Sequence, residues 1–483
     1  MDPPAGADDD GPMRSRSCLL GLLLGLAPGC GGDDDGPAPG PDAGLDAAVI
    51  QCSGGDVADL LAEIPGLTAT ERESDEPGYR AFDIEYDQPA DHAQPDGARF
   101  VQHLTLLHTD CEAAMVLHTT GYHGSQGAYL AEPTALLAAN QIDVEQRFFE
   151  PSRPEPADWS LLTIEQAAAD HHRIALALRP IYGGAWVSTG ASKGGMTSIY
   201  HRRFYPDDVD ATVAYVAPLS FGAPDDSYHP FFDTVGGEAC RAALRDFQRE
   251  LLLRREPLLA LMQADGDEQG ITFERLGGIE GAFEDAVIEF PWGFWQYGGG
   301  GTSMCDLVPA PEASDGELYD FFAVVGGSVF FVSDQVIEIY SPYYFQAETQ
   351  LGFPSSPRAH IEDLLEAQEA PRDYLPEGVT ATYDEGEAMR DIDEWVQGEA
   401  ERLLFVYGEW DPWYAGAFEL GAAVDSFLYV APELDHGAGI ADLAEADRDA
   451  ALDALARWTG ETLRAPGRER ARPAPPPPVM RPR

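Results

Sequence analysis

A serine flanked by glycines stands near the middle of the 483-residue chain, in the segment 187–195 (VSTGASKGG). An apolar run, 183–187, precedes it, and a helix-compatible run, 196–204, follows. A G-x-S-x-G pentapeptide between a strand and a helix is typical of a nucleophile elbow, a sharp turn that raises the serine hydroxyl above a sheet. In a chain with 50 glycines this pentapeptide also arises by chance, but the flanking signals favour the elbow. We therefore predict Ser192 as the nucleophile of an acyl transfer. Lys193, the only lysine of the chain, suggests a local role beside it.

A serine hydroxyl is a poor nucleophile near neutral pH, so it needs a base and a carboxylate that orients the base. Where this elbow occurs, the chain order is Ser, then Asp or Glu, then His. Asp411 follows the apolar run 403–407, and His436 follows the next one, 427–430. Both positions lie at the carboxyl ends of predicted strands. The sequence thus predicts a Ser192–Asp411–His436 triad.

Other residues compete for the acid and base roles. Glu409 and Asp435 are the rival acids: the Asp-Pro turn favours Asp411, and Asp435 directly precedes His436, where reach to the ring is awkward. The remaining candidates for the base are histidines that we expect to line the site, to pack or to lie on the surface: His118, His123, His171, His172 and His201.

An oxyanion hole should accompany the triad, because backbone N–H groups must stabilise the charge that develops on the substrate oxygen. One donor is expected to be the backbone N–H of Lys193. The second should come from the loop after the predicted strand 113–118, where Gly121 or Tyr122 is the natural donor; a simple tight turn is the alternative interpretation of that loop.

The triad must be positioned by alternating strands and helices. Strands are expected at 100–107, 113–118, 142–149, 183–187, 211–216, 403–407 and 427–430, and helices at 163–178, 196–204 and 441–459. Such alternation predicts a mostly parallel sheet, and together with the elbow it predicts the α/β-hydrolase fold. The stretch 220–395 lacks it, so we expect a large, mainly helical lid there. The core is then expected at 49–219 and 396–463.

The chain begins with features of export. Residues 13–16 (MRSR) form a basic region with two arginines, 19–27 are apolar but too short to span a bilayer, and Leu-Ala-Pro-Gly precedes Cys30. This segment, 1–30, resembles a lipoprotein signal in which Cys30 would be lipidated, although ordinary secretion stays open. We expect a disordered tether at 31–48 and a disordered Arg/Pro tail at 464–483.

Export also predicts disulfides, because oxidising compartments allow them. Four cysteines remain after the signal, and four allow three connectivities. We favour Cys52–Cys111 and Cys240–Cys305, because each pair stays within one expected folding unit.

The formal net charge of −54 argues against nucleic acid as a partner, because phosphate binding needs a basic face. No C-x-x-C or His-x-x-x-His spacing indicates a metal site, so we expect no metal and no cofactor. Contact with a membrane is expected only through a lipid anchor. We expect a monomer.

Several segments resemble one family. They are 188–197 (STGASKGGMT), 200–208 (YHRRFYPDD), 144–149 (VEQRFF), 294–297 (FWQY) and 343–352 (YYFQAETQLG). They resemble secreted bacterial tripeptidyl aminopeptidases, serine peptidases of the α/β-hydrolase clan that are distantly similar to prolyl aminopeptidases and lysosomal Pro-X carboxypeptidases. The resemblance spans about residues 60–460.

This resemblance implies an exported serine exopeptidase that releases short peptides, tripeptides among them, from free N-termini through an acyl-enzyme on Ser192. A pocket that binds the substrate ammonium needs a carboxylate, and Glu289, Glu348 and Glu145 are candidates. The alternatives are a lipid-anchored or secreted carboxylester hydrolase with the same triad, and a non-catalytic binding protein.

Overall fold

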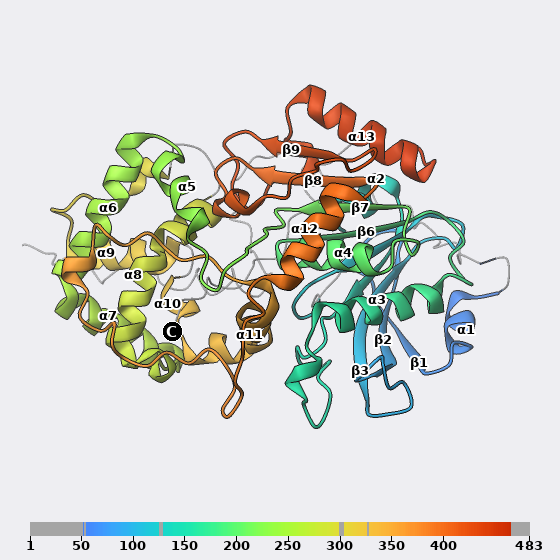
Figure 1. Cartoon of the computed structure of the whole chain (residues 1–483), viewed down its shortest axis with the longest axis horizontal. Coiled ribbons are helices and arrows are strands. Elements are labelled where there is room, and N and C mark those ends of the chain that lie inside the picture. The colour runs from blue at the N-terminus through green and yellow to red at the C-terminus, as the bar shows by residue number, and fades with distance from the viewer. Residues whose placement is uncertain (1–51, 53–54, 125–128, 299–303, 326–327, 465–483) are drawn as a thin grey trace, which may run out of the picture. The chain divides into compact units, whose positions relative to one another are not determined.

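A nine-stranded sheet is the centre of the part of the chain that this computed structural model describes, residues 52, 55–124, 129–298, 304–325 and 328–464 (Figure 1). The expected export segment, the tether 31–48 and Cys30 lie outside the described residues, as does 465–483 of the expected tail. None of the described helices is long and apolar enough to cross a membrane.

The strands lie in the order β1-β2-β3-β5-β4-β6-β7-β8-β9. The first three and β5 pair antiparallel, and the pairs from β5 onward are parallel. The strands are β1 Leu67–Arg72, β2 Arg80–Pro89, β3 Arg99–His108, β4 Met115–Thr119, β5 Asn140–Val144, β6 Trp186–Ala191, β7 Ala211–Tyr215, β8 Leu403–Gly408 and β9 Phe427–Ala431. The predicted α/β-hydrolase class, with a mostly parallel sheet, is confirmed.

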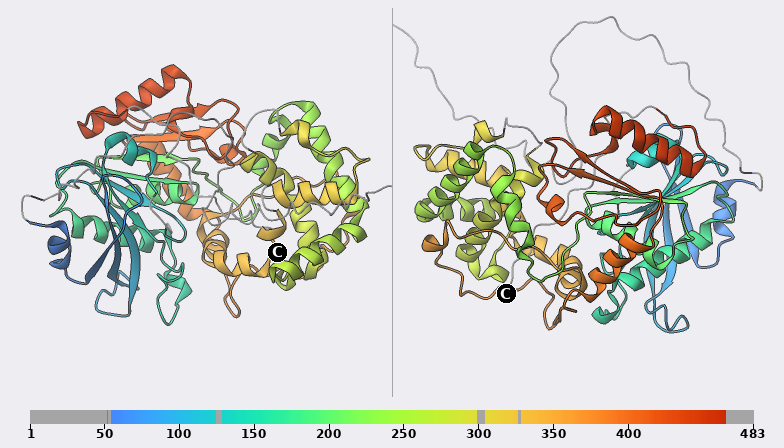
Figure 2. Two further views of the ribbon diagram at one scale, coloured as in Figure 1. Left: turned by 180° about the vertical axis from the view of Figure 1, so that it is seen from behind. Right: turned by 45° about the horizontal axis from the view of Figure 1, so that its top comes forward.

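Helices cover both faces of the sheet, which explains why β4, β5, β7 and β8 are buried at every position. Helices α1, α3, α4 and α12 lie on one face, and α2 and α13 on the other (Figure 2). The helices are α1 Val57–Ala62, α2 Glu132–Leu137, α3 Ile164–Leu178, α4 Lys193–Phe204, α5 His229–Thr234, α6 Glu238–Leu253, α7 Arg255–Gln269, α8 Gly278–Tyr297, α9 Asp315–Val324, α10 Ser328–Phe331, α11 Asp334–Gln346, α12 Glu387–Gly398 and α13 Glu445–Thr459.

Two predicted elements differ from the structure. The strand expected at 142–149 stops at Val144, because Phe148 and Phe149 are fully buried in the aromatic core of the helical segment instead of continuing the sheet. The helix expected from residue 441 begins at Glu445, after a 3-10 turn, Ile440–Asp442.

Between β7 and β8 the chain forms the helical insertion, α5–α11, which shares one large aromatic core and lies beside the sheet rather than on its faces (Figure 1). Helix α12 packs instead on α4, through Met389 and Ile392. The expected lid boundary at residue 395 falls inside α12, so by packing the insertion ends before Glu387.

Two disulfides join Cys52 to Cys111 and Cys240 to Cys305, the two pairs favoured from the sequence. The first ties the segment before α1 to the turn between β3 and β4. The second lies within the helical insertion, and its two Cα atoms are 5.2 Å apart. Each bridge therefore stabilises one folding unit.

Candidate active site

The nucleophile elbow is the turn between β6 and α4. Ser192 has φ +55° and ψ −128°, a strained conformation for a residue with a side chain. Its backbone N–H donates to the backbone carbonyl oxygen of Tyr215 in β7 at 2.9 Å, and its own carbonyl oxygen accepts from the backbone N–H of Met196 at 2.9 Å. These bonds hold the turn closed from both sides. The Ser192 side chain is thereby placed at the carboxyl edge of the sheet.

The glycines around Ser192 are required by close packing. A Cβ at Gly190 would lie 2.4 Å from the carbonyl carbon of Gly194, and one at Gly194 would lie 2.4 Å from the Thr119 oxygen. The Thr119 hydroxyl donates to the Gly194 oxygen at 2.7 Å and so joins β4 to the elbow. The G-x-S-x-G pattern thus reflects contact with the neighbouring strand as well as the turn itself.

Asp411 and His436 form the second half of the site. The His436 Nδ1 lies 2.6 Å from Asp411 Oδ2, and Asp411 Oδ1 accepts the Trp413 N–H at 3.1 Å. Burial raises the pKa of the Asp411 carboxyl, while the contact with His436 opposes that rise. The Nε2 atom of His436 has no hydrogen-bond partner among the described residues. The carboxylate therefore fixes the ring through Nδ1 and leaves Nε2 free to accept a proton.

The two rival acids, Glu409 and Asp435, accept hydrogen bonds from backbone N–H groups. Glu409 accepts the Glu433 N–H at 2.8 Å on the exposed side of the loop, and Asp435 accepts the Gly437 N–H at 3.0 Å within its own turn. Asp411 is the acid in hydrogen-bond contact with the His436 ring.

The rival histidines also have other partners or surroundings. His118 pairs with Asp143 at 2.5 Å, and His172 and His201 both contact Asp208, at 2.8 and 2.9 Å. The ring of His123 packs on aromatic side chains. His171 is buried, and burial lowers its pKa to about 3.

The loop after β4 lies against the first turn of α4, as expected for an oxyanion hole. Gly121 has φ +73°, and a Cβ there would lie 2.6 Å from the Gly194 nitrogen. The backbone N–H of Lys193 opens the helix, where N–H groups have no intrahelical partner. The backbone N–H of Tyr122 donates to the Thr120 hydroxyl at 3.3 Å, so it is the less suitable second donor.

The sequence suggested a local role for Lys193 because it is the only lysine of the chain, but it did not predict which groups the side chain contacts. It is 2% exposed, and its Nζ donates to the Gly121 oxygen at 2.7 Å. The Nζ also lies over the rings of Tyr122 and Phe149, 5.5 and 6.0 Å from their centroids. Burial lowers the pKa of this ammonium from 10.5 to about 7.

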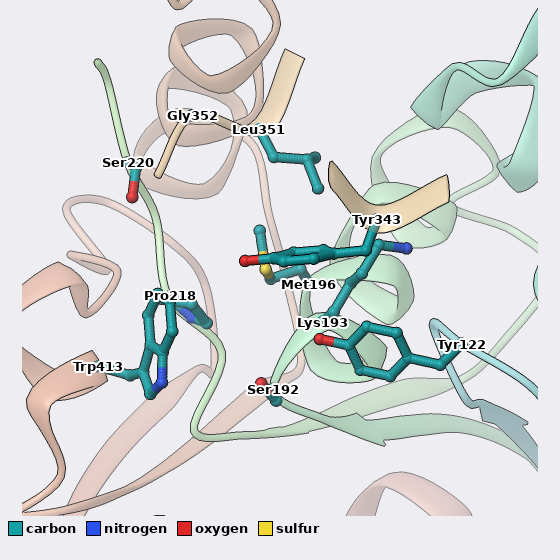
Figure 3. A pocket seen from close by; sticks show the side chains of 10 residues that line it. All are labelled: Tyr122, Ser192, Lys193, Met196, Pro218, Ser220, Tyr343, Leu351, Gly352 and Trp413. Carbon is teal, nitrogen blue, oxygen red and sulfur yellow. The ribbon is translucent and has the colours of Figure 1, made fainter. Parts of the chain in front are cut away.

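A pocket opens directly at Ser192 (Figure 3). Its walls are largely apolar and aromatic, and they come from the elbow and α4, from the loops after β4, β7 and β8, and from the helical insertion. The lining residues are Tyr122, Ser192, Lys193, Met196, Pro218, Ser220, Tyr343, Leu351, Gly352 and Trp413. The pocket therefore presents an apolar surface beside the nucleophile.

The three carboxylates predicted to bind a substrate amine are not among the residues that line this pocket. Glu145 accepts hydrogen bonds from Ser152 and from the Gly124 N–H, and Glu289 accepts from the Ser356 hydroxyl at 3.0 Å. Glu348 belongs to the π-helical turn Ala347–Leu351, whose last residue lines the pocket.

Among the described residues, one cluster has donors close enough together for a metal ion: Cys52, His108 and Cys111. Its two cysteines form a disulfide, so their sulfurs are not thiolate ligands. The expectation that the chain needs no metal or cofactor stays a prediction.

Comparison with known proteins places these features in context. Residues 51–480 match the family described as PS-10 peptidase S37. A protein of Streptomyces mobaraensis named prolyl tri/tetrapeptidyl aminopeptidase is 42% identical over 421 residues, which cover 86% of this chain and 87% of the relative.

Solved structures with similarity include proline iminopeptidase of Mycobacterium smegmatis, with 13% identity, a TM-score of 0.33 and coverage of 81% of this chain and 99% of that one. Acetyl xylan esterase 1 of Thermoanaerobacterium sp. has 11% identity, a TM-score of 0.32 and coverage of 85% and 95%.

Proposed function

Because the chain belongs to the peptidase S37 family of serine peptidases, we propose that it is an aminopeptidase that releases tri- or tetrapeptides from free N-termini, cutting after proline. Ser192 forms the acyl-enzyme, His436 accepts and returns the proton, and Asp411 orients His436. The observation that carries this proposal is the strained elbow at Ser192 together with the buried Asp411–His436 pair at the same edge of the sheet.

The helical insertion favours short products. Tyr343, Leu351 and Gly352 of the segment that follows α10 close the pocket over Ser192. The backbone N–H of His436 donates to the backbone carbonyl oxygen of Gln296 in α8 at 3.2 Å, so the insertion is bonded directly to the loop that carries His436. We expect this cover to limit how far the N-terminal segment of a substrate can extend from Ser192.

The pocket suits proline as the residue whose carbonyl is attacked. Trp413, Tyr343 and Pro218 provide flat apolar walls beside Ser192. A prolyl ring is compact, apolar and rigid, and burying it against aromatic faces requires no hydrogen-bond donor from the substrate. The name of the Streptomyces relative points to the same residue.

Glu348 is the carboxylate best placed to recognise the substrate ammonium. It belongs to the turn Ala347–Leu351, whose last residue lines the pocket, whereas neither β5, which Glu145 follows, nor α8, which carries Glu289, contributes a lining residue. A neutral N-terminus should bind poorly there, because it would lose the attraction between carboxylate and ammonium.

Export and anchoring through Cys30 belong to the same proposal. Two disulfides support an oxidising compartment, and the segment before Cys30 has the features of a lipoprotein signal. A Cys30→Ala protein should appear in the medium if the anchor holds the native one. Release of the unaltered protein after cleavage elsewhere would favour plain secretion.

A substrate panel tests the activity. We expect hydrolysis of a tripeptidyl arylamide with a free amine and proline at the cleavage site. Acetylating its N-terminus should lower kcat/KM by about 100-fold or more, because the ammonium contact is lost. Replacing the proline by alanine should lower it as well.

The matched variants are Glu348→Gln and Glu289→Gln. We expect only Glu348→Gln to reduce the difference in kcat/KM between the free and the acetylated substrate. Equal cleavage of free and blocked peptides would refute the aminopeptidase assignment. Turnover of esters without any peptide cleavage would instead indicate a carboxylester hydrolase.

A further inference from the structure

The Tyr122 side chain is a feature of the site that the triad does not use. Tyr122 belongs to the loop after β4, is 7% exposed and lines the pocket. Figure 3 shows its hydroxyl directed toward Ser192, and the two hydroxyls interact. Its ring is held edge-on against Phe149, Tyr340 and Tyr343, with centroids 5.7 to 5.9 Å away. The hydroxyl is therefore fixed beside the nucleophile by packing.

The backbone of Tyr122 is fixed as well. Lys193 Nζ donates to the oxygen of Gly121 at 2.7 Å, which holds the peptide that joins Gly121 to Tyr122. The same Nζ lies over the Tyr122 ring at 5.5 Å, within the range of a cation–π contact. Lys193 thus contacts both the preceding carbonyl and the ring, so it sets the position of the hydroxyl.

An oxyanion hole can use a side-chain donor beside backbone N–H groups such as those of Lys193 and Gly121. The backbone N–H of Tyr122 already donates to the Thr120 hydroxyl at 3.3 Å. The hydroxyl of the same residue is the polar group that the loop directs at Ser192. Burial raises the pKa of Tyr122 well above its ordinary value, so this hydroxyl keeps its proton and remains a donor.

We propose that Tyr122 is a catalytic residue whose phenolic hydroxyl donates a hydrogen bond to the oxyanion, together with the Lys193 backbone N–H, and that the Lys193 ammonium is its positioning residue. The inference rests on the proposed acyl transfer but not on the peptide substrate.

In the step concerned, Ser192 Oγ bonds to the carbonyl carbon while its proton passes to His436 Nε2. The π electrons of the C=O bond move to the oxygen, which becomes the oxyanion. Tyr122 donates to that oxygen without transferring its proton. When the tetrahedral intermediate collapses, the C=O bond re-forms, the bond between the carbonyl carbon and the leaving group breaks, and the leaving group takes the proton from His436, so that the acyl group stays on Ser192.

Tyr122→Phe tests the donor, because it removes the hydroxyl and keeps the ring contacts. We expect kcat to fall about 100-fold or more, as for other single oxyanion donors, with KM within about twofold. Affinity for a peptide boronate, which forms a tetrahedral adduct on Ser192, should fall by a similar factor. The control is Tyr340→Phe, whose ring packs on Tyr122 but does not line the pocket, and which should keep native kcat.

Lys193→Met tests the positioning. If Lys193 acts through Tyr122, the double variant should lose no more kcat than Tyr122→Phe alone. Additive losses would refute the positioning role, and a folded Tyr122→Phe protein with native kcat would refute the proposal as a whole. The kcat values of the Tyr122→Phe and Lys193→Met proteins can both be measured with an activated ester as substrate. A failure of the peptidase assignment would therefore be seen separately, as absent peptide cleavage.

Discussion

Replacing Lys193 with methionine should stabilise the folded protein at acidic and neutral pH. The side chain is fully buried on α4, and burial lowers the pKa of its ammonium from 10.5 to about 7. Methionine is similar in length, is apolar and fills irregular gaps, so the substitution removes the buried titratable group with little change in volume. The expected gain follows from the linkage between this pKa and folding.

The magnitude can be worked out from the two pKa values. Each pKa unit corresponds to about 1.4 kcal/mol, so accommodating Lys193 costs the folded state about 5 kcal/mol at pH 7 and below. The unfolded chain holds this proton up to about pH 10.5, whereas the folded chain releases it near pH 7. The cost is therefore present in full below pH 7 and falls by about 1.4 kcal/mol per pH unit above it, vanishing near pH 10.5.

The hydrogen bond to Gly121 acts in the opposite direction. Methionine cannot donate to that carbonyl oxygen, and a buried acceptor that loses its donor costs about 1 to 3 kcal/mol. The variant should then be more stable than the native protein by about 2 to 4 kcal/mol at pH 6. At pH 10 the order should reverse, with the variant less stable by about 1 kcal/mol.

The assay is urea unfolding of both proteins at pH 6 and pH 10 with the disulfides intact. The control is Arg203→Met on the same helix, a partly exposed guanidinium 3.0 Å from Asp391 that stays charged throughout this pH range. It should change stability by less than about 1 kcal/mol and equally at both pH values. A Lys193→Met protein that is less stable at pH 6, or whose difference from the native protein does not depend on pH, would refute the reasoning.

Three further substitutions test the site. Ser192→Ala should abolish hydrolysis with the unfolding midpoint retained, and a fluorophosphonate should label Ser192 once per chain; labelling elsewhere would move the nucleophile. Asp411→Asn should lower kcat by about 10⁴-fold, because His436 loses the carboxylate that sets its tautomer, and near-native turnover would exclude Asp411 as the acid. Gly121→Ala should lower both kcat and the melting temperature, because its Cβ would lie 2.6 Å from the Gly194 nitrogen; an unaffected protein would show that the loop does not need this close contact.

The local sequence determined the elbow. Such a turn needs glycine where two backbone segments approach closely. A Cβ at Gly190 or at Gly194 would lie only 2.4 Å from a neighbouring backbone atom. The same reasoning placed Asp411 and His436 after buried strands, and parallel strands bring their carboxyl ends to one edge. In the structure, His436 Nδ1 lies 2.6 Å from Asp411 Oδ2.

The cysteine pairing was also accessible from the sequence, because each pair lies within one folding unit. Strand ends were less accessible. Phe148 and Phe149 continue a β-rich pattern, yet they turn away from the sheet because the helical insertion offers them an aromatic core. No local pattern encodes the presence of that core.

The tertiary structure alone decided the surroundings of the nucleophile. Lys193 and Gly121 are 72 positions apart, and Tyr343 and Trp413 reach the pocket from different parts of the fold. The sequence predicted a backbone donor at Gly121 or Tyr122, whereas the structure directs the Tyr122 hydroxyl to Ser192. Turn and strand signals arise from backbone sterics over a few residues. The direction of a buried side chain is fixed by packing against segments far away in the chain, which neither periodicity nor spacing records.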